Sequence, residues 1–255
     1  MTRSVPFDID YKGLSKVDTS FMWLLTISAI VSIAIFIIDS MQAFPEKACI
    51  IAILNIISCV IAVSYFIADT IFSYLFQSAE ANRRNDFFDN SLNTQIADKN
   101  SFGYFSNDTM APGILKLGVN SFENSFFTKN VASEMLHGKV KICIVMVLIY
   151  IVVSLSGDRS LVVLFLQLAL PFTLIQKTIR LFVLRNRVED VFTKFQTIFS
   201  SAKEDNKAGL ILHNATSYET ALAWGGIQTD DDIFHKLNPQ LSIEWETIKD
   251  RYGLK

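Results

Sequence analysis

Two long uncharged stretches constrain the fold more than any other feature of the chain. Residues 21–38 carry no charged side chain between Asp18 and Asp39, and residues 49–68 carry none until Asp69. Each stretch is about 18 to 20 residues long, which at ~1.5 Å per residue spans the ~30 Å hydrocarbon core of a bilayer. A helix in a soluble core is rarely uncharged over such a length. The two stretches therefore predict transmembrane helices.

The same pattern returns in the second half of the chain, where residues 139–156 and 161–184 are largely apolar and a short polar turn separates them. Hydrophobic residues make up 51% of the chain and charged residues 19%, and the mean hydropathy is +0.34. These values exceed what a soluble domain needs. The sequence predicts an all-α integral membrane protein with four transmembrane helices in two hairpins and with cytosolic helical extensions.

The apolar stretches divide the chain into five regions. These are a cytosolic N-terminal segment (1–20), a first transmembrane hairpin (21–68), a cytosolic middle segment (69–138), a second transmembrane hairpin (139–184) and a cytosolic C-terminal helical region (185–255). Lys and Arg are concentrated on one side of the hairpins, so the positive-inside bias predicts a multi-pass protein with both termini in the cytoplasm. Asp18, Thr19 and Ser20 are N-cap candidates for the first helix. No A-x-A site follows this helix, which favours a retained span over a cleaved signal peptide.

The middle segment is predicted to contain two helices and a loop. Apolar residues continue past residue 68 into a charged, helix-compatible run, so the second transmembrane helix is expected to extend into the cytosol. Gly and Pro interrupt residues 100–120, which predicts a loop or a small irregular subdomain. A second helix is expected over residues 121–138, leading back to the membrane.

The C-terminal region carries two apolar stripes at helical spacing. The first comprises Val188, Val191, Phe192, Phe195, Ile198 and Phe199, and the second comprises Leu241, Trp245, Ile248 and Tyr252. The mixed polar face of the first stripe favours packing on another helix over lying on the membrane surface. Thr229 followed by Asp230, Asp231 and Asp232 predicts one helix start, and Asn238-Pro239 predicts another. These end helices are consistent with either a receptor domain or an oligomer contact.

A few polar residues and one proline lie inside the predicted spans: Asn55, Ser58, Gln167 and Pro171. Polar side chains at this depth usually face protein or water, and a proline kinks a membrane helix by removing one backbone hydrogen bond. Hydrogen bonding between helices is favoured over a pore lining for any one of them. Both interpretations remain open.

Enzymatic functions find no support in the residue patterns. The three histidines are scattered, and the three cysteines all fall within predicted spans, so no metal site is expected. No phosphate-binding glycine loop and no nucleophile elbow is present. The net charge of -2 gives no basic signature for binding a DNA or RNA polymer. We therefore expect a protein that is not an enzyme.

The middle segment contains the residue types that recognise a nucleotide ligand. Aromatic rings can stack on bases, amides can read base edges, and cations near a helix N-terminus can hold phosphate. The candidate ligand-binding residues are Arg83, Arg84, Asn85, Asp86, Tyr104, Asn120, Asn124, Phe127, Lys129 and Asn130. The alternative is that the Phe residues of this segment form the small core of a helical hairpin, and composition alone favours that alternative.

The stretches RRNDFFDNSLN (83–93) and NSFENSFFTKNV (120–131), set between two apolar hairpins, resemble the SMODS-associated four-transmembrane effector family. The resemblance covers nearly the whole chain. It implies a bacterial inner-membrane protein of cyclic-oligonucleotide antiphage signalling (CBASS), with a cyclic di- or trinucleotide as activating ligand and no other cofactor. It further implies a nucleotidyltransferase that makes the ligand, a homo-oligomer, and a pore that permeabilises the membrane in abortive infection. Arg83, Arg84 and Lys129 are then the expected phosphate contacts.

Two other functions remain open. One is a non-conducting membrane receptor or scaffold that signals to a protein partner through its C-terminal helices. The other is a small transporter, for which Asn55 and Gln167 offer thin support at mid-membrane and for which the two hairpins show no internal repeat.

Overall fold

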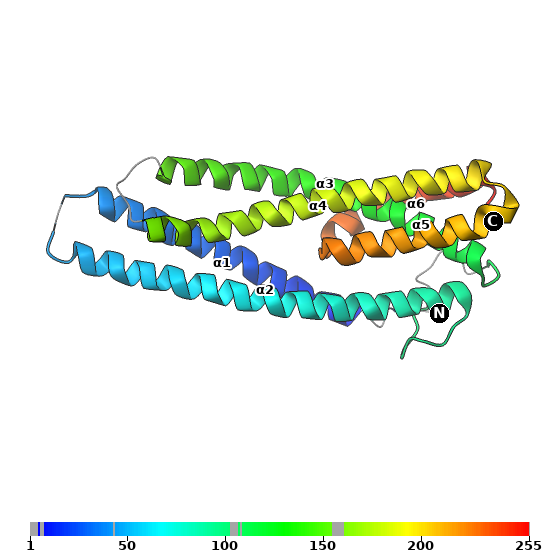
Figure 1. Ribbon diagram of the computed structural model, residues 1–255, viewed down its shortest axis with the longest axis horizontal. Coiled ribbons are helices and arrows are strands. Elements are labelled where there is room, and N and C mark those ends of the chain that lie inside the picture. Colours follow the sequence, from blue (N-terminus) through cyan, green and yellow to red (C-terminus); the bar gives the residue numbers. More distant parts are fainter. Residues whose placement is uncertain are drawn as a thin grey trace. The chain divides into compact units, whose positions relative to one another are not determined.

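A computed structural model describes residues 5, 8–42, 44–102, 107, 109–154 and 161–254, with the side chains of 149, 150 and 152–171 left out of the description. The described residues form six α-helices and no strand (Figure 1). In chain order these are α1 (Asp8–Ser40), α2 (Lys47–Leu92), α3 (Ile114–Ser154), α4 (Leu161–Ser201), α5 (Glu204–Gly225) and α6 (Asp231–Tyr252). The prediction of an all-α protein is confirmed.

The chain divides into two compact units. Unit 1 comprises Met1–Lys12, Phe76–His137 and Arg180–Lys255, and unit 2 comprises Gly13–Leu75 and Gly138–Ile179. The four longest helices, α1 to α4, each contribute residues to both units, whereas α5 and α6 belong to unit 1 alone. Each long helix thus passes from one unit into the other without a break in its backbone.

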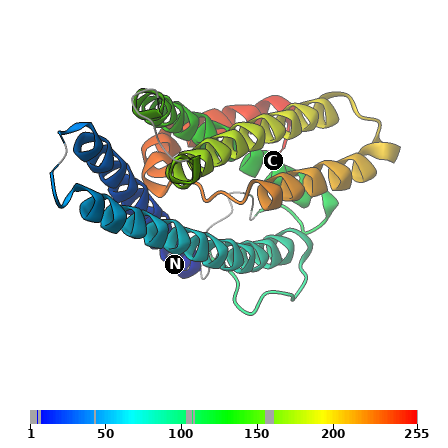
Figure 2. The same cartoon turned by 60° about the vertical axis from the view of Figure 1, so that its left-hand side comes forward.

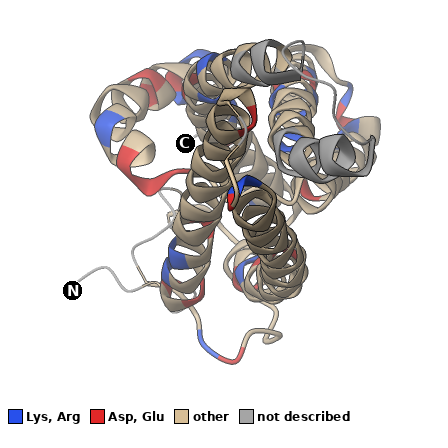
Figure 3. Cartoon of the chain, turned by 90° about the vertical axis from the view of Figure 1, so that its left-hand side faces the viewer, with Lys and Arg blue, Asp and Glu red and all other residues tan. Residues whose placement is uncertain are grey.

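Among the residues that the structure describes, two helices, α1 and α2, are long and apolar enough to cross a membrane, and most of each lies in unit 2. Only 28% of the apolar window of α1 and 17% of that of α2 are buried in the protein, whereas the core helix of a soluble protein is mostly buried. Their uncharged parts are visible in Figure 3 as long tan segments. Helices α3 and α4 run through residues 139–154 and 161–184, but part of this region lies outside the described side chains.

The parts of α1 and α2 in unit 2 run side by side in opposite directions (Figure 2). The ring of Phe21, near the start of the apolar part of α1, lies 5.0 Å from that of Tyr65 and 5.7 Å from that of Phe72, which come late in α2. One face of α1 is buried, including Leu14, Phe21, Leu25, Val31 and Ile35. The spacing of these residues is that of a helix packed along one side, and it leaves the other apolar faces exposed.

The start of α1 differs from the sequence prediction. Asp18, Thr19 and Ser20 are not N-cap residues, because α1 already begins at Asp8. The hydroxyls of Thr19 and Ser20 donate to the carbonyl oxygens four residues earlier, at 2.9 and 3.0 Å. Ser and Thr can satisfy their own polar groups in this way inside a helix, so they need not mark its start.

The core of unit 1 is built on the first C-terminal stripe. All six of its apolar residues, Val188, Val191, Phe192, Phe195, Ile198 and Phe199, are buried within one cluster. Phe122 of α3 is fully buried in the same cluster, and its ring centroid lies 5.0 Å from Phe192 and 5.3 Å from Trp245. The prediction that this stripe packs on other helices is confirmed. Phe122 of the middle segment joins the same core, which it shares with the C-terminal helices α4 and α6.

Helix α3 begins at Ile114 and not near residue 121, so the loop predicted for 100–120 is shorter than expected. Gly118 lies inside the helix, where it permits close packing against α5. A Cβ atom added to Gly118 would lie 2.9 Å from Cγ2 of Ile211. The glycine therefore marks a close approach between two helices and does not end one.

Helix α6 confirms the helix start predicted at residues 229–232, whereas the start predicted at Asn238-Pro239 is wrong. Asp230 caps α6, its carboxylate accepting from the Ile233 amide at 3.0 Å. Pro239 does not start a new helix, because it lies inside α6. Leu241 and Trp245 are buried in the unit 1 core as their spacing predicted.

Helix α2 runs continuously from the apolar stretch to Leu92, which confirms the predicted extension as a helix. It ends where Asn93 adopts a left-handed backbone with a φ of 58°. Asn is one of the few residues that tolerate this conformation.

Candidate functional site

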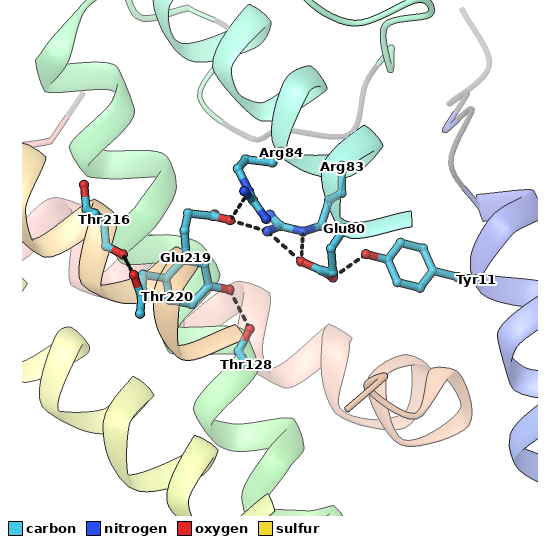
Figure 4. Close-up of polar contacts among 9 residues, drawn as sticks. Tyr11, Glu80, Arg83, Arg84, Thr128, Thr216, Glu219 and Thr220 are labelled. Carbon is cyan, nitrogen blue, oxygen red and sulfur yellow. Dashed lines mark hydrogen bonds and ion pairs between the residues drawn. The ribbon is translucent and has the colours of Figure 1, made fainter. Parts of the chain in front are cut away.

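A cluster of ionised side chains occupies the part of α2 that lies in unit 1. Arg83 Nη2 donates to Glu219 Oε2 of α5 at 2.6 Å, and Arg83 Nε donates to Glu80 Oε2 at 3.0 Å (Figure 4). The hydroxyl of Tyr11 in α1 donates to the other oxygen of Glu80, and Gln228 Nε2 donates to the Tyr11 carbonyl at 2.9 Å. The cluster thus joins α1, α2, α5 and the segment before α6.

Arg83 is fully engaged within this cluster. Its side chain is 13% exposed, and those of Glu80 and Glu219 are 9% and 11% exposed. Burial alone would lower the pKa of Arg83, but the carboxylates of Glu80 and Glu219 raise it well above its ordinary value. Its guanidinium therefore stays charged, and it serves to pair two buried acids.

Arg84 is held much more loosely than its neighbour. Its side chain is 38% exposed, and its Nε lies 3.4 Å from Glu219 Oε2, an ion-pair distance without a well-formed hydrogen bond. The second oxygen of Glu219, Oε1, is buried and accepts no hydrogen bond from the residues that the structure describes. Of the two arginines, Arg84 is therefore the one whose N–H groups can donate hydrogen bonds to a ligand.

The acidic pair of α2 anchors the loop that follows this helix. Asp86 accepts from the backbone amide and the hydroxyl of Ser101, both at 2.6 Å. Asp89 accepts from the Thr94 hydroxyl at 2.6 Å and from the amides of Ile96 and Ala97 at 2.9 Å each. Burial would raise the pKa of Asp89, but these hydrogen bonds outweigh it and lower the pKa. Asp86 is thus occupied with local structure.

Asn120 is the centre of a buried amide network. Its Nδ2 donates to Asn90 Oδ1 at 3.1 Å and to Ser91 Oγ at 3.0 Å, and its Oδ1 accepts from Asn107 at 3.0 Å. Asn107 also donates to Glu123 at 2.7 Å. The network ties the loop between α2 and α3 to both helices, so reading a base edge would require Asn120 to exchange partners.

Lys129 lies on the aromatic core of unit 1. Its Nζ is 4.1 Å from the ring centroid of Phe192 and 5.8 Å from that of Phe126. Burial lowers the pKa of Lys129, against the raising effect of Glu189. Lys129 is half-buried, and its ammonium already has a cation–π partner.

The remaining predicted ligand residues are spread over the same helices. Asn85, Asn124 and Phe127 are half-buried, and the Asn130 amide donates to the Phe126 carbonyl of its own helix at 2.8 Å. Tyr104 lies outside the described residues. The assignment of these residues to a ligand site stays a prediction.

The residues predicted for a pore or for helix packing are described in part. Asn55 is half-buried, and Ser58 is buried with a hydroxyl that has no hydrogen-bond partner among the described atoms. Gln167 and Pro171 lie in α4, at positions whose side chains are outside the description.

A second charged cluster, in unit 2, was not predicted. Lys177 of α4 lies between Asp69 Oδ1 at 3.6 Å and Asp18 Oδ1 at 4.0 Å, and its Nζ is 3.8 Å from the ring centroid of Phe21. One feature of the sequence points to this cluster: Lys177 is a cation inside a largely apolar stretch and therefore needs a partner. The carboxylates that flank the two uncharged stretches were its available partners.

Within the described part of the chain no group of three or more His, Cys, Asp and Glu residues could hold a metal ion. The chemistry that these sites offer is the binding of charged groups, anions at Arg84 and a cation in the Lys177 cluster. No protein-family model, curated protein or solved structure matches this chain.

Proposed function

We propose that the chain is a ligand-gated membrane effector with four transmembrane helices. In this proposal unit 1 lies in the cytosol and binds a cyclic di- or trinucleotide, and unit 2 spans the bacterial inner membrane and permeabilises it. The supporting observation is that α1 to α4 each run unbroken from a unit with buried ionic contacts into a unit whose apolar faces are exposed. A ligand that moves these helices in unit 1 acts on the same helices in the membrane.

The exposed apolar surface of unit 2 supports the membrane location. Trp23, Ile30, Ile56 and Phe66 are all well exposed on α1 and α2, and contiguous apolar surface of this kind requires lipid or another protein to cover it. The corresponding parts of α3, including Val145 and Leu148, are also exposed. Four helices from one chain enclose little space, so a pore requires several copies.

Arg84 is the group best suited to receive a ligand phosphate. Arg83 already pairs with two carboxylates, and Lys129 lies over the Phe192 ring. A phosphate on Arg84 competes with Glu219, which shares its Oε2 between both arginines. Because a ligand can shift a conformational equilibrium only by its differential affinity, this competition is the step that would convert binding into movement of α2 against α5.

Dye leakage from liposomes tests the proposal. The purified full chain is reconstituted, its insertion is verified, and a panel of cyclic di- and trinucleotides is added. One of them is expected to trigger leakage in a concentration-dependent way. Absence of leakage with every ligand, despite insertion, would reject the effector function and favour the non-conducting scaffold.

Two variants then test the ligand site. Arg84→Gln is expected to raise the ligand concentration for half-maximal leakage by roughly 10- to 100-fold, the effect of losing one charge-assisted hydrogen bond. Arg251→Gln is the matched control, because Arg251 is exposed near the end of α6, and it should leave this concentration unchanged. An unchanged response in Arg84→Gln would show that the phosphate site is elsewhere.

A further inference from the structure

Unit 2 contains a cage of aromatic rings and carboxylates around one ammonium group. Besides its 3.8 Å approach to the Phe21 ring, Lys177 Nζ lies 5.6 Å from the ring centroids of both Tyr65 and Phe72. All three rings are almost completely buried. We define the cage as the side chains of Asp18, Phe21, Tyr65, Asp69 and Phe72.

The cage is built entirely from the first hairpin. Asp18 and Phe21 are three residues apart on α1, and Tyr65, Asp69 and Phe72 are spaced four and three residues apart on α2. Residues at these spacings share one face of a helix. The occupant, Lys177, comes from α4 of the second hairpin. The cage and its occupant therefore belong to separate parts of the chain that meet in unit 2.

The charges of the cage exceed those of its occupant. Two carboxylates face a single ammonium, and the faces of three aromatic rings add further attraction for a cation. The carboxylates lie 3.6 and 4.0 Å away, beyond a short hydrogen bond. The carboxylates attract a cation, and the three rings favour one that carries apolar substituents, which is the chemistry of an alkylammonium ion.

We propose that this cage is a binding site for an alkylammonium group, which the chain fills with its own Lys177 and so fastens α4 to α1 and α2. A tethered occupant has a high effective concentration and excludes free amines. Shortening the side chain at position 177 opens the site, and a free alkylammonium ion then takes the vacant place. The cage does not depend on a cyclic nucleotide, because its contacts with Lys177 lie within unit 2.

Amine rescue of a truncated variant tests the cage. Thermal unfolding of the full chain in detergent micelles is followed with n-butylammonium chloride, with n-butanol as a neutral control of the same shape and with sodium chloride at equal ionic strength. Lys177→Ala is expected to melt about 2–4 °C below the wild type, given the usual strength of cation–π contacts. Butylammonium should raise that midpoint saturably, whereas butanol and sodium chloride should not.

The cage residues supply the specificity control. Adding Phe21→Leu to Lys177→Ala removes the ring nearest the ammonium and should weaken the rescue by roughly two- to fivefold in amine concentration, the effect of one cation–π contact at a partly exposed site. Equal rescue in the presence and absence of Phe21, or equal effects of butylammonium and sodium, would overturn the proposal.

A second pair of variants keeps the test decisive if Lys177→Ala does not fold. Lys177→Arg retains a cation that suits aromatic faces, and Lys177→Met retains the length and removes the charge. The Arg variant should melt within about 1 °C of the wild type, and the Met variant should melt lower by the same 2–4 °C expected for Lys177→Ala. Equal midpoints for the Arg and Met variants would contradict a cation site.

Discussion

Unit 1 and unit 2 each hold a cation between two carboxylates from different helices, but the two clusters differ in burial and contact. Arg83 is 13% exposed and makes hydrogen bonds of 2.6 and 3.0 Å to its acids. Lys177 is 32% exposed, and its carboxylates are 45% exposed and 3.6 to 4.0 Å away. The Arg83 cluster is held by short hydrogen bonds, whereas the Lys177 cluster combines longer ion-pair distances with contacts to aromatic rings.

The difference has a physical basis in the two side chains. A guanidinium presents a planar fork that satisfies two carboxylates at once, and it remains charged when buried. An ammonium is a compact, strongly hydrated charge without a planar fork, and at a partly exposed site its contacts with aromatic faces are weaker than in a desolvated one. The guanidinium of Arg83 thus suits a buried site between two acids, and the ammonium of Lys177 occupies a site that is partly exposed.

The largest effect is expected for Arg83→Met. Removing the guanidinium leaves Glu80 and Glu219 buried without their cation, and breaking a buried pair in this way costs about 3–5 kcal/mol. The free energy of unfolding, measured in detergent micelles, should fall by this amount. Arg251→Met, at an exposed position of α6, should change it by less than about 0.5 kcal/mol. A similar small change for Arg83→Met would show that the cluster is not structural.

The second-largest loss of stability is expected for Gly118→Ala, because unit 1 is tightly packed around this residue. The added methyl group would lie 2.9 Å from Cγ2 of Ile211, and a β-branched side chain in a buried position has little freedom to move. Overpacking of this kind costs about 1–3 kcal/mol. Gly209→Ala is the matched control in α5, because nothing lies within 4 Å of its added Cβ. It should stabilise unit 1 by roughly 0.4–1 kcal/mol.

The sequence predicts those features that depend on residues close together in the chain, and it does not predict contacts between distant residues. The uncharged stretches, the buried stripe at 188–199 and the helix start at residues 229–232 are local patterns, and the sequence alone predicts all three. The role of Glu219 is not predicted, since it pairs with Arg83 across 136 residues and no local pattern connects them. The sequence does not reveal the start of α1, because Thr19 and Ser20 bond to their own helix. It does not reveal that Gly118 lies inside α3, because the residue that it packs against belongs to another helix.

The candidate ligand residues illustrate the same limit. Arg83, Asp86 and Asn120 have the right chemistry for a nucleotide, but each has partners that the sequence does not reveal. Polar residues in an aromatic segment serve equally well to anchor a loop or to bind a ligand. Only their neighbours in space distinguish the two, and those neighbours leave Arg84 as the most available cation.

Acid should weaken unit 1 through Asp89. Its folded pKa lies below the ordinary value of 3.8 because of hydrogen bonds from Thr94, Ile96 and Ala97. Its contribution is therefore complete above about pH 4 and is lost as the pH falls through the folded pKa. Asp89→Asn should cost about 1–2 kcal/mol at pH 7, and the difference from the wild type should shrink below pH 4. A difference that stays constant down to pH 2 would contradict the ionised anchor.

The smallest effect is expected in unit 2, for Asp69→Asn. Asp69 is partly exposed, and its oxygen lies 3.6 Å from Lys177. The substitution should therefore lower the free energy of unfolding by only about 0–1 kcal/mol. Salt should reduce the cost further, because added ions screen exposed pairs at these distances. Unfolding in detergent at low and at 1 M sodium chloride measures both quantities, with Arg83→Met as the reference whose cost should change little. If Asp69→Asn proved as costly as Arg83→Met and equally insensitive to salt, both clusters would be fixed contacts. The rings of the aromatic cage would then contribute little to holding Lys177, because its carboxylates alone would account for the binding of the ammonium.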